Sequence, residues 1–550
     1  MRVESCLRRP WHPVAMVAVL ALWLTTVGNL PLWWALVRLP DMQLGAWRSL
    51  ALFGALLLAF NQLVLGLTLW PVWRKAMGLL LISVCAFSSY FMQAYGVVID
   101  PTMLANALHT DGREVRDLLS VDMWWPLLFG VLLPGYWWVR QPVRPLGWRR
   151  TGSAQSALVL LSAVAMVLVG WLAFQDLASS MRNHKALRYM INPYNTAYAL
   201  LRVGVGRAAH AEMPLQPVGV DARHQGNIAP VPNQGPLLLL VVGETLRADH
   251  VGMAGYGRDT SPRLSRLHAS GELVFFDHVT SCGTNTEVSV PCMFSPLGRD
   301  DERDGVRQEN LLDVLQRAGL AVLWLDNQSG CKGVCDRVPN ASTREGADPT
   351  RCPDGECFDE ALLQSLPGRL QQLDPVRQQR GTVVVLHMMG SHGPAYFKRT
   401  PPSHKVFQPE CTDQALQHCE RAHVVNAYDN TARYADHVLA ELIDWLRQQQ
   451  RPTGLWFVSD HGESLGENGL FLHGMPYAMA PRAQTHVPML AWFSGDWQRR
   501  QRVSTACLRQ KSGQPYSHDH LFHTVLGLTD VATRIRQPAL DIAADCRSAA

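Results

Sequence analysis

The first 176 residues of this 550-residue chain contain five apolar stretches, and these constrain its fold more than any other feature. The stretches lie near 13–36, 50–72, 76–98, 124–139 and 155–174. An α-helix rises about 1.5 Å per residue, so roughly 20 apolar residues cross the hydrocarbon core of a bilayer. Four stretches meet this length, whereas 124–139 is short and contains two prolines. We expect a five-helix transmembrane bundle over residues 1–176.

The loops between these stretches alternate in charge, which supports five spans. Basic residues precede the first stretch and lie in the loops after the second and the fourth, whereas the loop at 99–123 carries five acidic residues. Positively charged loops stay in the cytoplasm, so five crossings export the C-terminal half. Without the fourth span this alternation would be broken. A cleaved signal peptide is the alternative for the first stretch, but that stretch is too long and no small-residue cleavage site follows it.

Cysteine usage agrees with this topology, because ten of the twelve cysteines follow residue 176. They form four close pairs and a fifth candidate pair: Cys282 with Cys292, Cys331 with Cys335, Cys352 with Cys357, Cys411 with Cys419, and Cys507 with Cys546 as the candidate. An even set of close pairs is typical of disulfides in an oxidising compartment, which for a bacterial inner-membrane protein is the periplasm. The alternative is a structural zinc site with four cysteine ligands from CKGVC and CPDGEC.

The exported half is expected to be a mainly helical bridge and linker over 177–235, followed by a catalytic domain over 236–550. In that domain, short apolar runs bounded by turn signals occur at 236–244, 320–327, 381–390, 454–463 and 485–493. Segments that resemble helices separate them, for example 309–319 and 430–449. This alternation predicts an α/β domain with a central, mostly parallel sheet covered by helices on both faces.

The ends of three predicted strands carry metal-ligand side chains. Glu244 ends the first run, Asp460 and His461 end the fourth, and His392 follows the third. Ligands in open α/β sheets bind outside the carboxyl ends of the strands, and Glu, Asp and His suit zinc or manganese. A turn capped by an aspartate explains any single match equally well, but three such ends in one domain favour a metal site. His387 lies within an apolar run, which favours a core histidine.

The segment VTSCGTNTEVSVPCMFSPLG, residues 279–298, supplies hydroxyl groups ahead of an expected helical turn. A hydroxyl at a helix N-terminus is a candidate nucleophile and metal ligand, and the N–H groups there suit a phosphate. Spacing does not decide between Thr284 and Thr286. The alternative is that both threonines only cap the helix.

Five motifs together resemble one enzyme family. They are VVGETLRADH (241–250), SCGTNTEVSVPCMFS (281–295), DNQSGCKGVC (326–335), GSHGPAYF (390–397) and SDHGESLGENGLFLHGMP (459–476). Their order and sequence resemble those of lipid A phosphoethanolamine transferases, which include the mobile colistin-resistance enzymes and belong to the alkaline phosphatase/sulfatase superfamily. The resemblance covers nearly the whole chain. It implies an alkaline-phosphatase-like periplasmic domain attached to five spans.

The resemblance also implies roles for particular residues. The zinc ligands would be Glu244, Thr286, Asp460 and His461, with Thr286 as the nucleophile. His392 and His473 would line the substrate site, exchange protons and hold a second zinc ion. Ser329 and Lys332 would contact the phosphoethanolamine headgroup, and Asn106, Thr110 and Glu114 would lie in the lipid pocket. The chain differs from the family pattern at Asn285 and Glu287, where small neutral residues are expected.

The implied reaction transfers phosphoethanolamine from phosphatidylethanolamine to a phosphate of lipid A. It proceeds through a phosphothreonine, releases diacylglycerol and lowers the negative surface charge that attracts polymyxins such as colistin. The alternative is a phosphoethanolamine or phosphoglycerol transferase that acts on the lipopolysaccharide core or a periplasmic glucan. A sulfatase is disfavoured, because the sequence VPCMF lacks the C/S-x-P-x-R motif. A net charge of +4 gives no reason to expect a nucleic-acid partner, and we expect a monomer.

Overall fold

The structure is a computed structural model that describes residues 10–38, 46–110, 112–118, 120–183, 185–229, 231, 234–299, 307–345 and 351–547. The chain divides into two compact units. The first contains Met1–Leu104 and Leu119–Val203, and the second contains Ala105–Leu118 and Gly204–Ala550. The second unit therefore includes a short segment that the sequence places between two apolar stretches.

The first unit supplies four helices long and apolar enough to cross a membrane, among the residues that the structure describes. These candidate spans are Pro13–Val37, Trp47–Thr68, Arg74–Tyr95 and Trp148–Leu172. They belong to α1 (Pro13–Thr25), η2 (Val27–Asn29), α2 (Leu30–Val37), α3 (Ala46–Thr68), α4 (Arg74–Tyr95) and α8 (Trp148–Asn183). The membrane-spanning character of this unit is thus confirmed for four of the five stretches.

The count of five spans is not confirmed, because the stretch at 124–139 is not among these candidates. Its backbone is helical, as η4 (Val121–Met123), η5 (Pro126–Leu132) and α7 (Leu133–Arg140), but η5 is a π-helix. Proline lacks an N–H donor, and π turns interrupt the regular α-helical ladder. Regular α-helix therefore covers mainly the second half of the stretch.

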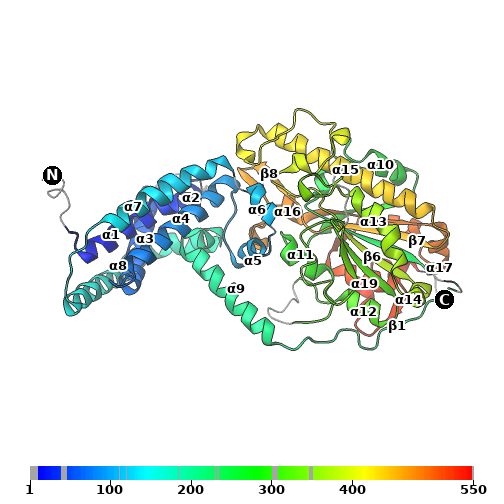
Figure 1. The fold of residues 1–550 in the computed structure, drawn as a ribbon, viewed down its shortest axis with the longest axis horizontal. Helices are drawn as coiled ribbons and strands as arrows, with labels where there is room; N and C mark the ends of the chain where they lie inside the picture. Colours follow the sequence, from blue (N-terminus) through cyan, green and yellow to red (C-terminus); the bar gives the residue numbers. More distant parts are fainter. Residues whose placement is uncertain are drawn as a thin grey trace. The chain divides into compact units, whose positions relative to one another are not determined.

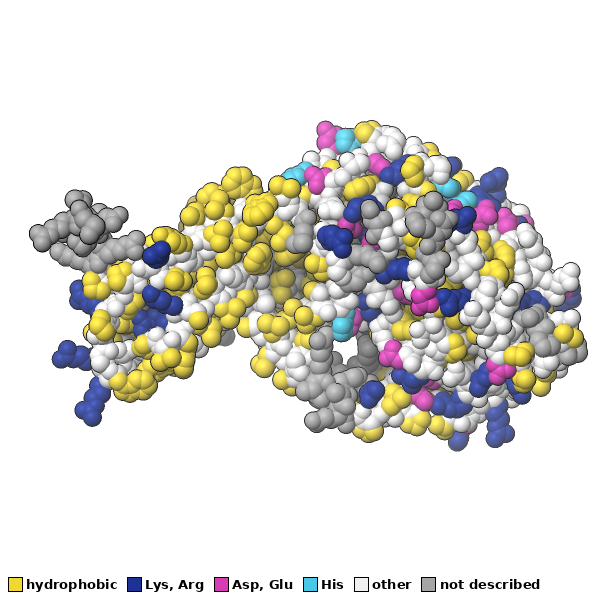
Figure 2. Space-filling model, in the orientation of Figure 1, with side chains coloured by type: hydrophobic (Ala, Val, Ile, Leu, Met, Phe, Trp, Pro, Cys, Tyr) yellow, Lys and Arg dark blue, Asp and Glu magenta, His cyan; other side chains and the backbone are white. Residues whose placement is uncertain are grey.

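Large apolar side chains cover the outside of the first unit (Figure 2). On α8, the exposed set among the described side chains is Trp148, Leu160, Leu161, Val164, Val167, Leu168, Trp171 and Leu172. The helix continues past residue 176 to Asn183 and is followed by η6 (Lys185–Met190) and α9 (Tyr194–Glu212). An apolar outer surface is what a lipid environment requires.

The second unit contains an eight-stranded mixed sheet in the order β11-β3-β10-β7-β2-β6-β4-β5. Its strands are β2 (Leu237–Gly243), β3 (Leu273–Thr280), β4 (Ala321–Asp326), β5 (Asn340–Ser342), β6 (Thr382–His387), β7 (Thr453–Ser459), β10 (His486–Phe493) and β11 (Pro515–Ser517). Five of the seven pairings are parallel, and β10 is antiparallel to both of its neighbours. All five predicted strands are present, but the sheet is mixed because β10 runs against the others.

Helices cover both faces of this sheet (Figure 1). In β2, Leu238, Leu240 and Val242 belong to one apolar core, and the alternate residues Leu237, Leu239 and Val241 belong to the other. The first core is completed by α11 (Thr286–Met293), α12 (Leu311–Arg317), α17 (Gly495–Gln501), α18 (Thr505–Lys511) and α19 (Asp519–Leu528). The second is completed by α10 (Pro262–Ala269), α13 (Glu360–Gln371) and α15 (Arg421–Arg447). A strand buried on both faces requires the continuous apolar run seen in the sequence.

The remaining α-helices and strands of the second unit are short. They are α5 (Pro101–His109, which begins in the first unit), α6 (Gly112–Leu118), α14 (Pro375–Arg380) and α16 (Arg482–Thr485), and the strands β1 (Arg223–His224), β8 (Ser464–Glu467), β9 (Leu470–Leu472) and β12 (Val531–Ala532).

The ten cysteines after residue 176 all form disulfides, and every expected pair is confirmed. The bonds join Cys282 to Cys292, Cys331 to Cys335, Cys352 to Cys357, Cys411 to Cys419 and Cys507 to Cys546. A sulfur atom in a disulfide is not a thiolate and does not act as a zinc ligand. The alternative of a four-cysteine zinc site, which needed Cys331, Cys335, Cys352 and Cys357 as ligands, is therefore wrong.

Candidate active site

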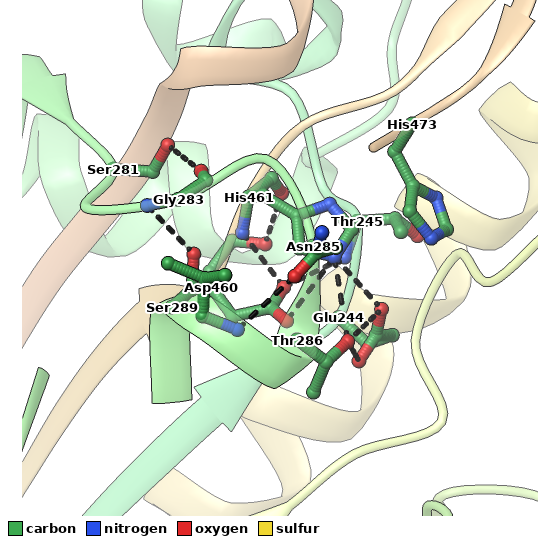
Figure 3. Close-up of polar contacts among 12 residues, drawn as sticks. Glu244, Thr245, Ser281, Gly283, Asn285, Thr286, Ser289, Asp460, His461 and His473 are labelled. Atoms are coloured by element: carbon green, nitrogen blue, oxygen red, sulfur yellow. Dashed lines mark hydrogen bonds and ion pairs between the residues drawn. The ribbon is translucent and has the colours of Figure 1, made fainter. Parts of the chain in front are cut away.

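Two neighbouring parallel strands bring the predicted carboxylates together (Figure 3). Gly243 of β2 lies opposite Ser459 of β7, so Glu244 and Asp460 follow at the same edge of the sheet. The Asp460 N–H donates to Gly243 O at 2.9 Å, and the Thr245 N–H donates to Asp460 Oδ1 at 3.2 Å. These bonds tie the two strand ends to each other beyond the regular ladder.

Glu244, Asp460 and His461 form a compact, fully buried cluster. His461 Nε2 lies 3.3 Å from Glu244 Oε1 and 3.3 Å from Asp460 Oδ2. His461 Nδ1 lies 2.9 Å from the carbonyl oxygen of Gly462, which can only accept a hydrogen bond. Nδ1 therefore carries a hydrogen, and the lone pair of a neutral ring points from Nε2 toward the two carboxylates.

The protonation preferences of this cluster reflect two carboxylates buried beside one imidazole. Burial raises the pKa of Asp460, and the negative charge of Glu244 raises it further. Burial alone would lower the pKa of His461, but Asp460 and Glu244 outweigh it and raise the pKa. Asp460 Oδ2 is buried and has no hydrogen-bond partner among the described residues. Two carboxylates and an imidazole that converge in this way fit a divalent metal ion.

The N-terminus of α11 places Thr286 at this cluster (Figure 3). Its hydroxyl lies 3.1 and 3.2 Å from the two Glu244 oxygens and 3.4 Å from His461 Nε2. Asn285 caps the helix by accepting the Val288 N–H, and the Cys282–Cys292 disulfide closes the loop that carries both residues. The helix dipole at this end favours negative charge on the hydroxyl oxygen.

The structure separates the two candidate nucleophiles. The Thr284 hydroxyl donates to the backbone oxygen of Met475 at 2.6 Å, which fixes the loop. Only the Thr286 hydroxyl, of these two, contacts the cluster. Geometry thus favours Thr286, which spacing alone left undecided.

His392 and His473 lie beside the cluster. The His473 ring is 4.4 Å from the His461 ring and 5.6 Å from the His392 ring, between centroids. His473 Nδ1 donates to Glu463 Oε2 at 3.0 Å, because a carboxylate accepts, and this leaves Nε2 available to a ligand in the neutral ring. Both histidines are buried. The structure therefore brings them together as the resemblance implies.

The segment after β4 supplies a contact that the sequence analysis missed. Gln328 Nε2 donates to Glu244 Oε2 at 2.9 Å. The next residue, Ser329, accepts a hydrogen bond from Lys332 Nζ at 3.1 Å, so the two predicted headgroup contacts lie together. Gln328 follows the carboxyl end of β4, and the same rule that singled out Glu244 would have found it.

His387 supports the cluster from the core. Its Nδ1 donates to Asp326 Oδ1 at 2.9 Å, and its Nε2 lies 4.0 Å from Glu244 Oε2. Burial would lower the pKa of His387, but the hydrogen bond and charge of Asp326, together with the charges of Glu244 and Asp460, outweigh it and raise the pKa. This agrees with the interpretation of a core histidine paired on one side.

Of the three predicted lipid-pocket residues, Asn106 and Thr110 make no side-chain hydrogen bond or ion pair with the cluster in the described part of the chain. The Thr110 hydroxyl donates to the backbone oxygen of Asn106 at 2.8 Å, within the end of α5. The side chain of Glu114 lies outside the described residues. The same segment does reach α11, because His109 Nδ1 lies 2.6 Å from Glu287 Oε1. No sequence pattern links these two residues.

Comparison with known proteins identifies the family. A family model described as sulfatase matches residues 236–531, and one described as phosphoethanolamine transferase EptA/EptB matches residues 56–208. The phosphoethanolamine transferase EptA of Salmonella typhimurium (strain LT2) is 41% identical over 520 residues, covering 92% of this chain and 93% of that protein. This chain belongs to the phosphoethanolamine transferases.

Two further relatives extend the match over nearly the whole transferase. The phosphatidylethanolamine transferase Mcr-1 of Escherichia coli is 36% identical, covering 95% of this chain and 96% of that protein. The solved structure of the integral membrane lipooligosaccharide phosphoethanolamine transferase A of Neisseria meningitidis is 34% identical, with a TM-score of 0.92, covering 98% of this chain and all of that chain. Both units thus belong to one transferase, whose second unit has the sulfatase-like fold.

Proposed function

We propose that this transferase moves phosphoethanolamine from phosphatidylethanolamine to a phosphate of lipid A. The observation that supports this best is the Thr286 hydroxyl, held at a helix N-terminus and 3.1 Å from Glu244 in the buried cluster. A hydroxyl in such a site is suited to attack phosphorus and to carry the group as a phosphothreonine. The product bears an additional ammonium group and attracts cationic antimicrobial peptides less, which gives resistance to polymyxins.

Zinc is the cofactor we propose, held by Glu244, Asp460, His461 and Thr286. When bound, it would lower the pKa of the Thr286 hydroxyl and offset negative charge on the transferring oxygens. Asp460 Oδ2, which lacks a hydrogen bond among the described residues and lies 3.3 Å from His461 Nε2, supports this ligand set. We assign a second zinc position to His392 and His473, whose rings adjoin.

The reaction would have two balanced steps. The Thr286 oxygen releases its proton to water and attacks phosphorus, the phosphorus–oxygen bond to glycerol breaks, and diacylglycerol leaves with a proton from His392 or His473. An oxygen of the acceptor phosphate then attacks the phosphothreonine. The bond to Thr286 breaks, a diphosphate linkage forms, and Thr286 regains a proton. The Lys332 ammonium, beside Ser329, would bind the phosphoryl oxygens.

The lipid substrate explains the membrane unit. We retain Asn106, Thr110 and Glu114 as lipid-pocket residues, and boundaries at 176 and 235 between membrane, bridging and catalytic segments. The protein lies in the inner membrane of a Gram-negative bacterium, with its catalytic domain in the periplasm. We propose that it acts as a monomer.

We also propose that the stretch at 124–139 is a fifth span. It runs antiparallel along α4: a side chain at Gly130 would meet Ala86, one at Gly135 would meet Leu79, and one at Gly78 would meet Trp138. Small residues at close helix approaches are typical of membrane bundles. A fifth crossing also restores the charge alternation of the loops. Cysteine-accessibility labelling on both sides of the stretch tests this topology.

Mass spectrometry of lipid A tests the function directly. Cells that express the wild-type chain should gain phosphoethanolamine on lipid A, and cells that express Thr286→Ala should not. In the purified full chain, one or two zinc ions and donor-dependent release of diacylglycerol are expected. Release of diacylglycerol with an unmodified lipid A would point to a core sugar or a glucan as acceptor. Retained turnover in Thr286→Ala would contradict the nucleophile assignment.

A further inference from the structure

Two buried polar atoms beside the nucleophile lack a partner among the described residues. They are Nδ2 of Asn285 and Oε2 of Glu287, and Asn285 is 1% exposed. A buried donor or acceptor without a hydrogen bond destabilises a fold, and most buried polar atoms in folded proteins are hydrogen-bonded. Atoms of this kind on both sides of Thr286 indicate a ligand that supplies what they need.

The free atom of Asn285 is a donor. Its Oδ1 accepts the Val288 N–H at 3.0 Å, and this helix cap fixes the orientation of the amide, since Nδ2 cannot accept. Asn285 directly precedes Thr286, and Figure 3 shows it among the cluster residues. A donor at this position matches the anionic oxygens of a phosphoryl group that reaches Thr286.

The free atom of Glu287 is an acceptor with negative charge. Its Oε1 is held by His109 Nδ1 at 2.6 Å, so Oε2 remains. The Glu287 side chain as a whole is 19% exposed, although Oε2 itself is buried. A carboxylate oxygen in this position matches an ammonium group.

We propose that Asn285 and Glu287 recognise the two ends of the transferred phosphoethanolamine. Asn285 Nδ2 donates to a phosphoryl oxygen, and Glu287 Oε2 accepts from the ammonium group. The ammonium nitrogen is separated from phosphorus by only one oxygen and two carbons, which suits two residues that flank the nucleophile. Glu287 then makes the site selective for an aminoalkyl headgroup. This inference rests on the proposed function.

Simpler roles explain only half of each side chain. Helix capping accounts for Asn285 Oδ1, and the bond to His109 accounts for Glu287 Oε1. An acidic residue in the first helical turn is also favoured by the helix dipole. None of these roles uses Asn285 Nδ2 or Glu287 Oε2.

Two substitutions separate capping by Asn285 from donation. Asn285→Asp keeps the capping oxygen but loses the donor, and Asn285→Ala loses both without adding charge. We expect both variants of the full chain to lose kcat/KM for phosphatidylethanolamine by about 10- to 100-fold, with zinc content unchanged. Only Asn285→Ala should also lower Tm. A wild-type rate in Asn285→Asp, with a slow Asn285→Ala, would show that Asn285 is only a cap.

Glu287→Gln tests selectivity for the ammonium group, because it keeps the size of the side chain but removes its charge. Two donors are compared in mixed micelles: phosphatidylethanolamine and phosphatidylpropanol, which has a methyl group in place of the ammonium. The wild type should prefer the first by about 10- to 100-fold in kcat/KM, mainly through KM, and Glu287→Gln should nearly abolish the preference. If Glu287→Gln lowers kcat/KM equally for both donors, or keeps the wild-type preference for phosphatidylethanolamine, the assignment of Glu287 is wrong.

Thr286→Ala is measured in parallel to distinguish the two hypotheses. If it lacks turnover while Asn285→Asp and Glu287→Gln behave as the wild type, the recognition pair is wrong and the proposed function stands. If Thr286→Ala retains turnover, the proposed nucleophile is wrong as well.

Discussion

The two units of this transferase distribute polar and apolar groups in opposite ways. The first exposes large apolar side chains, such as Leu161 and Trp171 of α8, and buries Asn29, Asn61 and Asn192 completely. The second buries its apolar residues in two cores on either side of the sheet. Burial of apolar surface stabilises a fold only against water, so in lipid the packing and hydrogen bonds between helices carry more of the stability.

The buried polar groups of the two units also differ in purpose. In the first unit, Asn29 Nδ2 donates to Leu24 O at 2.7 Å and to Asn192 O at 2.8 Å, and Asn29 Oδ1 accepts the Asn192 N–H. In the second, Asp460 Oδ2 and His387 Nε2 are buried with no hydrogen-bond partner among the described residues. The Asn29 amide is thus fully hydrogen-bonded within the first unit, whereas the Asp460 carboxylate of the site keeps one oxygen open to a ligand.

The largest expected effect comes from removing one of these open atoms. Asp460→Asn should lose bound zinc and reduce turnover by about 10³-fold or more, because metal catalysis supplies several kcal/mol and each 1.4 kcal/mol is a factor of ten. The fold should persist, since the change also removes the repulsion from Glu244. Zinc content, turnover and circular dichroism check this. Asp277→Asn, on an exposed position of β3, is the control, and zinc retention at Asp460→Asn would contradict the ligand assignment.

Two disulfides separate stability from activity within the second unit. Cys507 and Cys546 are separated by 39 positions in the sequence. Replacing both with alanine should lower the free energy of unfolding by about 4 kcal/mol and change kcat little. Cys282–Cys292 spans ten residues and carries the Thr286 loop, so its removal should cost about 3 kcal/mol and also lower kcat. Thermal unfolding in detergent and turnover are measured together. Equal loss of kcat in both double variants would contradict this division.

The third prediction concerns acid stability of the second unit. His518 accepts the Cys282 N–H at Nδ1 and donates from Nε2 to Ser459 O at 2.9 Å, which only the neutral ring does. Burial lowers the pKa of His518 from 6.5 to about 4. The stability it contributes is therefore complete above pH 6.5 and is lost as the pH falls toward 4, by up to about 3 kcal/mol.

Unfolding of the full chain between pH 7 and 4 measures this effect. His518→Gln should flatten the pH dependence, whereas His418→Gln, on the exposed surface, should leave it unchanged. An identical pH profile for the wild type and His518→Gln would exclude this histidine as the cause.

The smallest effect is expected in the first unit. Asn29→Leu should destabilise the membrane helices by about 1–2 kcal/mol, because hydrogen bonds between such helices are worth about 0.6 kcal/mol on average and Asn29 makes three. Zinc content should not change. Val167→Ala, on the exposed face of α8, should leave Tm unaltered in detergent. A larger fall in Tm with Val167→Ala than with Asn29→Leu would contradict the proposed contrast between the units.

The strands that could be predicted from the sequence are those buried along nearly their whole length. Continuous apolar runs were enough to predict the strands β2, β4, β6, β7 and β10. The positions of strand ends were enough to predict that Glu244, Asp460 and His461 lie close together. The missed strand β3 has four buried residues followed by the exposed Asp277 and His278, which interrupt the pattern. Strand direction leaves no trace in such runs, so the antiparallel course of β10 was not predictable.

Contacts between distant segments were the least predictable part of the site. The choice of Thr286 over Thr284 needed the family resemblance, and the structure explains it through the bond from Thr284 to Met475. The contact between His109 and Glu287 joins residues 178 positions apart and depends on how the chain folds back, not on a local pattern. Hydrophobic periodicity records the environment of a residue but not the identity of its partner.

The segment Ala105–Leu118 has a practical consequence for dissecting this protein, because the second unit is not simply the second half of the sequence. Asp117 of this segment pairs with Lys398 at 2.5 Å and with Arg399 at 3.2 Å. The Arg399 side chain is 3% exposed and also pairs with Glu356. In a secreted fragment that begins at residue 204, Arg399 would lose its ion pair with Asp117 and keep the one with Glu356. Co-expression of the 105–118 peptide would restore the lost ion pair.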